Sequence, residues 1–285
     1  GKCAHKYGIP FVVDVNDLWP EAFRVALDVP VLSDIFFAPF YKQAKATYQL
    51  ADAIEGTSQE YRDRGVRDAR SGIPNEVVYV GNQLAEFDAG VAKNAVLIDK
   101  PAGEIWVSYA GTLSACYDLE TLVKAIGMVQ KTHPEVKLQI LGDGAERDNL
   151  KAVVQSTGAG VTFHGYLPYD KMAAWLSRSD ITVNSLVEKA AQSIVTKIGD
   201  YLAAGKPMVN TSMSAEFRAK VESDGFGVNV RPGSPDKLAA AVTALVEDEW
   251  HRKQMGEAAR KIAEEQFDRP HSYMKTVKLI ESLIR

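Results

Sequence analysis

The sequence predicts an α/β protein built on doubly wound parallel sheets. Short, nearly continuous apolar runs alternate with amphipathic segments along almost the whole chain of 285 residues. Continuous apolar runs are typical of parallel strands that are covered on both faces. Their alternation with helical periodicity favours a sheet flanked by helices, and the length allows two domains.

Each expected element coincides with one such run. Strands are expected at residues 11–15, 53–56, 77–80, 106–110, 137–141, 161–164, 180–184, 207–210 and 227–230. Helices are expected at 119–132, 145–156, 169–178, 194–204, 235–247, 250–266 and 270–284, where apolar residues recur every three or four positions. Residues 1–10 read as the end of a helix that leads into the first strand. Residues 81–104 show no clear period, so we expect an irregular connection there.

Composition excludes several classes of protein. With 46% hydrophobic and 25% charged residues the chain has the composition of a soluble globular protein. A net charge of −4 does not indicate nucleic-acid binding. Cys3 and Cys116 are far apart and have no zinc-site spacing, which fits a reducing cytoplasm. No apolar run approaches the roughly 20 residues that cross a bilayer.

Residues 192–209 contain the most informative local pattern. Lys197 lies near the start of an expected helix, Asp200 follows three residues later, and Gly205 ends the helix before an apolar strand. Free N–H groups at a helix start, together with an ammonium group, suit an anion. Asp200 would accept hydrogen bonds from sugar hydroxyls. The same pattern also fits a capped helix with a surface lysine.

Loops that follow strands are the other candidate positions, because open α/β sheets bind ligands beyond the carboxyl ends of their strands. Gly111 would permit close approach of a phosphate or sugar, and Gly142 and Gly144 would leave N–H groups facing a ligand. An ordinary tight turn is the alternative for each. Asp17, after the strand at 11–15, would either orient an acceptor hydroxyl or cap the next segment.

Eight segments in one order resemble a known family. They are DVNDLWPEAF (14–23), GTSQEYRDRGV (56–66), VYVGNQLAEF (78–87), SYAGTLSACYDLETLVKAI (108–126), LQILGDGAERDNL (138–150), VTFHGYLPYDKMAAWLSRSDITV (161–183), TKIGDYLAAGKPMV (196–209) and GFGVNVRPGSPDKLAAAV (225–242). Together they resemble the retaining glycosyltransferases of family 4, of the bacterial surface-polysaccharide type, which have the GT-B fold.

The resemblance implies a domain organisation. A partial N-terminal, acceptor-side Rossmann-like domain would span residues 1–84, and a linker would follow at 85–104. A complete donor-nucleotide domain would span 105–268, and a helix at 269–285 would cross back to the first domain. The chain starts in an αβ unit without an initiator Met, so we expect the first part of the N-terminal domain to be missing.

The resemblance also implies roles for single residues. Tyr166 and Leu167 would meet the nucleobase, although Tyr166 would equally fit a packing role, and Asp200 would hold the ribose. Gln192 stands where relatives carry an acid that faces the donor sugar, and Ser193 beside it would also bind the donor. Thr196-Lys197 resembles a Ser-Lys pair of some relatives. Thr112 stands where many members have Arg. Lys197 must therefore supply most of the charge that offsets the diphosphate.

These observations predict transfer of a sugar, with retention, from a nucleotide-diphosphate sugar to a glycan or lipid-linked glycan in cell-surface polysaccharide biosynthesis. Asp17 and Lys197 would be the catalytic residues, and no metal or cofactor is expected. The location would be the cytoplasm or the inner face of the cell membrane. Membrane contact would involve the missing part or residues 34–42, whose apolar side chains fit a core equally well.

Two other classes remain open. A non-catalytic nucleotide-sugar-binding or scaffold protein is favoured by Gln192 and by the absence of the usual cations. A sugar-nucleotide epimerase of the same fold would need further acid and base side chains. We expect this chain by itself to bind a donor without efficient catalysis.

Overall fold

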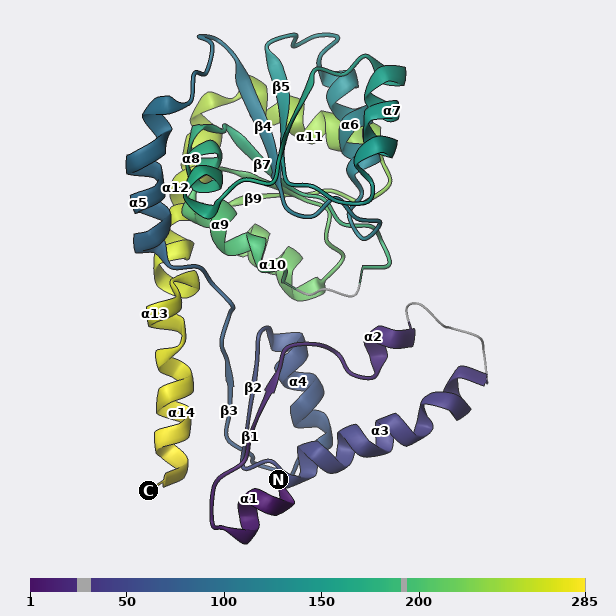
Figure 1. Ribbon diagram of the computed structural model, residues 1–285, viewed down its shortest axis with the longest axis vertical. Coiled ribbons are helices and arrows are strands. Elements are labelled where there is room, and N and C mark those ends of the chain that lie inside the picture. The colour runs from purple at the N-terminus through teal and green to yellow at the C-terminus, as the bar shows by residue number, and fades with distance from the viewer. Residues whose placement is uncertain (25–31, 191–193, 285) are drawn as a thin grey trace. The chain divides into compact units, whose positions relative to one another are not determined.

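Contacts along the chain divide the computed structural model, which describes residues 1–24, 32–190 and 194–284, into two compact units (Figure 1). The described residues of the smaller unit fall in Gly1–Val80, Ala191–Ile194 and Arg269–Arg285, and those of the larger unit fall in Gly81–Ala190 and Val195–Asp268. Each unit contains its own parallel sheet. The chain is therefore an α/β protein with parallel sheets, as its sequence predicts.

The larger unit has a six-stranded sheet in the order β6-β5-β4-β7-β8-β9. The strands are β4 Ile105–Ala110, β5 Val136–Leu141, β6 Val161–Gly165, β7 Ile181–Asn184, β8 Met208–Asn210 and β9 Gly227–Asn229. Every neighbouring pair is parallel. The chain winds outward from β4 in both directions, so the topological switch point of this doubly wound sheet lies between β4 and β7.

Helices cover both faces of this sheet. They are α5 Leu84–Asn94, η1 Ala95–Leu97, α6 Leu119–Val129, α7 Arg147–Thr157, α8 Tyr169–Arg178, α9 Lys197–Ala203, α10 Ala215–Ser223, α11 Pro235–Glu247, α12 Glu249–Ile262 and the π-helical turn η2 Ala263–Phe267. Helices α6, α7 and α11 lie on one face and α8 and α9 on the other (Figure 1). Fully buried side chains such as Val107, Leu138 and Ile126 fill the core between sheet and helices.

Two helices of the larger unit are not anticipated by the sequence. Helix α5 occupies part of the segment expected to be irregular, because Leu84, Phe87 and Gly90 recur every three residues on one buried face. A side chain at Gly90 would meet the backbone of Asp170 at 2.8 Å, so this glycine lets α5 pack closely on α8. Helix α10 is the second. Helix α9 is shorter than the expected 194–204.

The smaller unit has a three-stranded parallel sheet in the order β1-β2-β3. Its elements are α1 Lys2–Lys6, β1 Val12–Val15, α2 Glu21–Arg24, α3 Leu32–Leu50, β2 Ala53–Gly56, α4 Gln59–Asp68, β3 Asn75–Val77, α13 Arg269–Ser272 and α14 Met274–Ile284. Strand β3 ends earlier than the expected 77–80. Its partner β2 ends at Gly56, which pairs with Val77, and only the Val78 N–H continues the ladder, donating to the Gly56 carbonyl at 3.0 Å.

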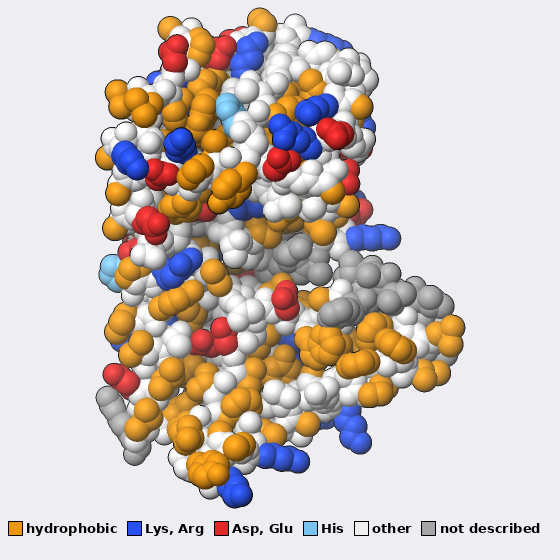
Figure 2. Space-filling view, viewed as in Figure 1, with side chains coloured by type: hydrophobic (Ala, Val, Ile, Leu, Met, Phe, Trp, Pro, Cys, Tyr) orange, Lys and Arg blue, Asp and Glu red, His pale blue; other side chains and the backbone are white. Residues whose placement is uncertain are grey.

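Helix α3 divides the apolar segment 34–42 between core and surface. Phe37 is 4% exposed, whereas Ile35 is 68% and Phe36 is 63% exposed. Figure 2 shows hydrophobic side chains gathered over this helix. Across the described ranges, no helix has both the length and the hydropathy that a membrane crossing requires.

Candidate functional site

The ladder between β4 and β7 ends before the strands do. Val107 pairs with Ile181 and Ser108 with Thr182, and no later pair follows. The backbone of Ala110 bonds instead to the buried hydroxyl of Tyr201 on α9, which accepts from its N–H at 2.8 Å and donates to its carbonyl at 3.0 Å. The structure thus opens at the switch point, the position where sheets of this type bind ligands.

Lys197, the first residue of α9, reaches the carboxyl end of β4. Its Nζ donates to the Tyr109 hydroxyl at 2.9 Å and lies 4.1 Å from the centroid of the Tyr109 ring and 3.7 Å from that of Tyr117. A Cβ added to Gly111 would lie only 2.7 Å from Nζ. The structure therefore brings together Lys197 and Gly111, two residues proposed from the sequence.

The charge of Lys197 depends on pH in the neutral range. Burial lowers the pKa of its ammonium group to about 7, far below that of an ordinary lysine. Within the described residues Lys197 forms no ion pair. The aromatic faces offset part of the burial cost, since a cation is attracted to the negative face of a ring. A half-buried ammonium without a carboxylate partner suits an incoming anion.

Tyr109 and Tyr117 were missed by the sequence analysis. Tyr109 is fully buried, and its hydroxyl donates to the Thr112 carbonyl at 2.8 Å. The two rings meet edge to face, with centroids 5.8 Å apart. Burial raises the pKa of both hydroxyls, so both stay neutral at physiological pH. Nothing in the sequence pairs Tyr109 with a lysine 88 positions later.

Three glycines allow the loops after β4 and β5 to touch. Gly111, Gly142 and Gly144 have φ angles of 147°, 142° and 159°. A Cβ on Gly142 would lie 1.9 Å from the Gly111 carbonyl oxygen, and one on Gly144 would lie 2.3 Å from that of Leu113. No side chain fits these distances, so glycine is required for the close approach of the loops.

The N–H groups of these loops are mostly occupied. Gly142 donates to the Gly165 carbonyl at 2.8 Å, and Gly144 donates to its neighbour Asp143 at 2.8 Å. The prediction that both N–H groups face a ligand is therefore wrong, because they hold the loops together. Thr112 is exposed, and its N–H donates to no protein group in the part of the chain that the structure describes.

The start of α9 offers fewer donors than expected. The Ile198 N–H donates to the Val195 carbonyl at 3.0 Å, and the Gly199 N–H donates to that of Thr196 at 3.3 Å. The expectation of free N–H groups at these two residues is wrong, since the preceding turn occupies them. Thr196 is exposed and makes no capping bond. Gln192 and Ser193 lie outside the described residues.

Hydrogen bonds to Asp200 link three segments of the larger unit. Its Oδ1 accepts from the Tyr169 hydroxyl at 2.8 Å and from the Asn82 amide at 3.0 Å. Burial and the adjacent carboxylate raise the pKa of Tyr169, which remains a donor. These partners give Asp200 a structural task in addition to the predicted contact with a ribose.

Two further predicted residues are freely accessible. Tyr166 is 81% exposed in the loop after β6 and makes no ring contact within the described ranges, and Leu167 beside it is half-buried. A packing role for Tyr166 is therefore not what the structure shows. Asp17 belongs to the smaller unit and is exposed beyond β1; its carboxylate caps no described helix.

Buried asparagines connect the carboxyl ends of β7, β8 and β9. The Asn184 amide donates to Asn210 at 2.9 Å, and the Asn210 amide donates to Asn229 at 2.8 Å. The Ser212 N–H donates to the same Asn210 oxygen at 3.1 Å, which fixes the direction of the whole chain of bonds. The Asn184 Oδ1 is therefore left as a buried acceptor without a partner.

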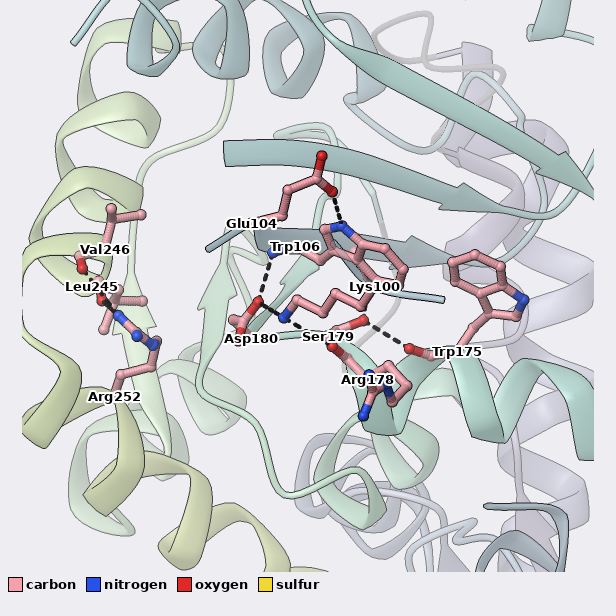
Figure 3. Close-up of polar contacts among 11 residues, drawn as sticks. Lys100, Glu104, Trp106, Trp175, Arg178, Ser179, Asp180, Leu245, Val246 and Arg252 are labelled. Carbon is pink, nitrogen blue, oxygen red and sulfur yellow. Dashed lines mark hydrogen bonds and ion pairs between the residues drawn. The ribbon is translucent and has the colours of Figure 1, made fainter. Parts of the chain in front are cut away.

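The amino-terminal edge of the same sheet carries a different set of charges (Figure 3). Asp180 pairs with Lys100 and also accepts from the Trp106 N–H at 2.6 Å. Lys100 donates in addition to the Arg178 carbonyl at 3.2 Å. Burial lowers the pKa of Lys206, and the Asp180 carboxylate partly opposes that effect. No group of three or more His, Cys, Asp or Glu in the described residues is arranged to hold a metal ion.

Sequence comparison identifies relatives of this chain. Residues 104–248, which are just over half of the 285, match the family described as glycosyl transferases group 1. An uncharacterised glycosyltransferase of Methanocaldococcus jannaschii is 21% identical over 243 residues, which cover 84% of this chain and 61% of that protein. The lipopolysaccharide core biosynthesis glycosyltransferase LpsE of Rhizobium meliloti is 27% identical over 182 residues, covering 63% and 50%. The chain thus spans only part of these relatives.

Solved structures share the fold. The Anabaena protein HepE in complex with UDP has a TM-score of 0.78 at 18% identity, covering 99% of this chain and 74% of that one. Sucrose-phosphate synthase of Thermosynechococcus elongatus has a TM-score of 0.74 at 22% identity, covering 99% and 76%. At these identities the similarity establishes a GT-B fold with Rossmann-like units, in agreement with the sequence prediction.

Proposed function

Because the chain belongs to the glycosyl transferases of group 1, we propose that its larger unit binds the nucleotide-diphosphate sugar of a retaining sugar transferase. The sugar would pass to a glycan or lipid-linked glycan in cell-surface polysaccharide biosynthesis. LpsE, a relative named for lipopolysaccharide core synthesis, and HepE, a structural neighbour solved with UDP, support this class of substrate.

One observation carries the proposal. The Lys197 ammonium lies at the carboxyl end of β4, next to Gly111, and has no carboxylate partner among the described residues. A diphosphate would gain a charge-assisted hydrogen bond there, and the free Thr112 N–H would supply a neutral one. Positive charge at this place stabilises the leaving diphosphate as the glycosidic bond breaks.

Other residues have supporting roles in the proposal. The exposed Tyr166 ring would stack on the nucleobase, with Leu167 beside it. Gln192, Ser193 and Thr196 would line the donor-sugar side, and the Asp200 carboxylate would hold the ribose while remaining bonded to Tyr169. Asp17 in the smaller unit would orient the acceptor hydroxyl. The chemistry would need no catalytic metal.

Domain roles follow from the same proposal. The smaller unit would be the acceptor side, with the helix at 269–285 as part of it. Residues 85–104, expected to be a linker, belong to the larger unit, where α5 packs on α8. The exposed Ile35 and Phe36 on α3 would provide peripheral contact with the inner membrane face. Binding of the chain to anionic vesicles, compared with an Ile35→Ser/Phe36→Ser variant, tests that contact.

Calorimetry with UDP, GDP and their glucose conjugates tests the donor site. We expect binding of at least one nucleotide diphosphate, and a loss of about 100-fold or more in affinity for Lys197→Met. Lys206→Met is the matched control, because Lys206 is also a half-buried lysine of the larger unit with a lowered pKa, but at the opposite edge of the sheet. Failure to bind any nucleotide favours the scaffold alternative. Conversion of the sugar nucleotide without an acceptor favours the epimerase.

A further inference from the structure

The Lys197 ammonium is bonded to one tyrosine hydroxyl and faces the rings of two tyrosines. An ammonium group offers three N–H donors. The Tyr109 hydroxyl takes one of them at 2.9 Å, and the rings of Tyr109 and Tyr117 face the group at 4.1 Å and 3.7 Å from their centroids. An oxyanion that approaches Lys197 from the side of the Tyr117 ring must therefore displace that ring.

The two tyrosines are held to very different degrees. Tyr109 is 0% exposed near the carboxyl end of β4, and its hydroxyl bridges Lys197 to the Thr112 carbonyl. Tyr117 is half-buried in the segment between β4 and α6, and its hydroxyl makes no hydrogen bond within the described part of the chain. Moving Tyr117 costs an edge contact with Tyr109, the cation–π contact and its partial packing against the core, whereas Tyr109 is a buried member of that core.

We propose that Tyr109 is a positioning residue that aims Lys197 at the donor diphosphate, and that the Tyr117 ring occupies the place of a phosphate until the donor displaces it. This inference rests on the proposed function of the same site. It extends that function by assigning opposite effects on affinity to two side chains that both touch one ammonium group.

The proposal has a consequence for pH dependence. Two titratable groups face Lys197, Tyr109 from β4 and Tyr117 from the segment between β4 and α6. Burial raises the pKa of both hydroxyls, so both stay neutral. On its own helix, Asp200 is bonded to Tyr169 and Asn82, and Tyr201 is bonded to Ala110. Burial lowers the pKa of Lys197 to about 7. Donor affinity should therefore fall as pH rises above about 7, when the neutral amine no longer attracts the diphosphate.

Calorimetric titration with UDP-glucose between about pH 6 and pH 9 tests the proposal. Tyr117→Ala removes the competing ring, so affinity should rise about three- to tenfold. Water then reaches the ammonium group, and the pH above which affinity declines should move upward by about one unit. Tyr109→Phe deletes the hydroxyl that aims Lys197 and should weaken binding about three- to tenfold.

Two controls separate this mechanism from a change in packing. Tyr117→Phe keeps the ring over the ammonium group and should therefore lack the gain in affinity and the shift in pH profile expected for Tyr117→Ala. In the Lys197→Met background Tyr117→Ala should give no gain in affinity, because the gain acts through the ammonium group. Weaker binding by Tyr117→Ala, or an unchanged pH profile, would overturn the roles proposed for Tyr109 and Tyr117 while leaving the proposed donor site intact. Donor binding that survives Lys197→Met would instead overturn the proposed function.

Discussion

Half-buried lysines at the amino-terminal and carboxyl edges of the larger sheet have different kinds of partner. At the amino-terminal edge Lys100 is paired with Asp180, and the same carboxylate binds a backbone N–H (Figure 3). At the carboxyl edge the Lys197 ammonium bonds to Tyr109 and faces two tyrosine rings, and it has no carboxylate partner among the described residues. Removing one partner of a buried ion pair is strongly destabilising, whereas a buried charge without a partner opposes folding and can pair with an incoming anion. The difference supports the proposal of a donor site at the carboxyl edge.

The largest expected effect comes from removing the Asp180 carboxylate at the amino-terminal edge. Asp180→Ala leaves Lys100 and Lys206 without a carboxylate and the Trp106 N–H without an acceptor. We expect the larger unit to lose about 3 kcal/mol of stability, measured by urea unfolding. Asp180→Asn keeps an acceptor for the N–H and should lose less. Equal stability of Asp180→Ala and the parent chain would contradict the role assigned to this ion pair.

At the carboxyl edge, a change in backbone packing should cost less stability but should also remove binding. In Gly142→Ala the new Cβ would meet the Gly111 carbonyl oxygen at 1.9 Å, at a φ of +142°. Separation of the two loops should cost about 2 kcal/mol and move Gly111 away from Lys197. Gly158→Ala is the control, because Gly158 also has a positive φ but nothing lies within 4 Å of the new methyl group. Its cost should stay near 1 kcal/mol, with donor binding retained.

Removing the unpaired charge of Lys197 should stabilise the fold, which is the opposite of the effect expected for Asp180→Ala at the other edge. The folded-state pKa of Lys197 is about 7, below that of a lysine in an unfolded chain. The unfolded state therefore binds more protons between about pH 7 and pH 10, and stability should rise with pH across that window. Lys197→Met should flatten this rise and add about 1 kcal/mol at pH 7, or about 2–4 °C in Tm. A lower Tm for Lys197→Met would mean that the tyrosine contacts outweigh the burial cost.

The sequence predicts the sheet of the larger unit well, because its strands are continuous apolar runs with few competing patterns. It misses α5, whose buried face includes Gly90 and Asn94, residues that do not read as apolar periodicity. For the site, it predicts Lys197 and Gly111 from local pattern, and the structure brings these two residues together. It does not identify Tyr109, Tyr117 or the partners of Asp200, because those contacts join residues distant in sequence and depend on the register of packed elements.

The smallest effect is expected at Asn184, the free end of the asparagine chain at the carboxyl edge. Asn184→Ala removes one hydrogen bond to Asn210, but Asn210 still accepts from the Ser212 N–H at 3.1 Å. The substitution also removes the unpartnered Oδ1, a buried acceptor whose desolvation opposes folding. These effects partly cancel, so the loss should be about 1 kcal/mol. Asn210→Ala, by contrast, strands a donor on Asn184 and an acceptor on Asn229 and should cost at least twice as much by urea unfolding. Equal losses of stability in the two variants would contradict this assignment. They would mean that the Asn184 Oδ1 has a partner that this conformation does not contain.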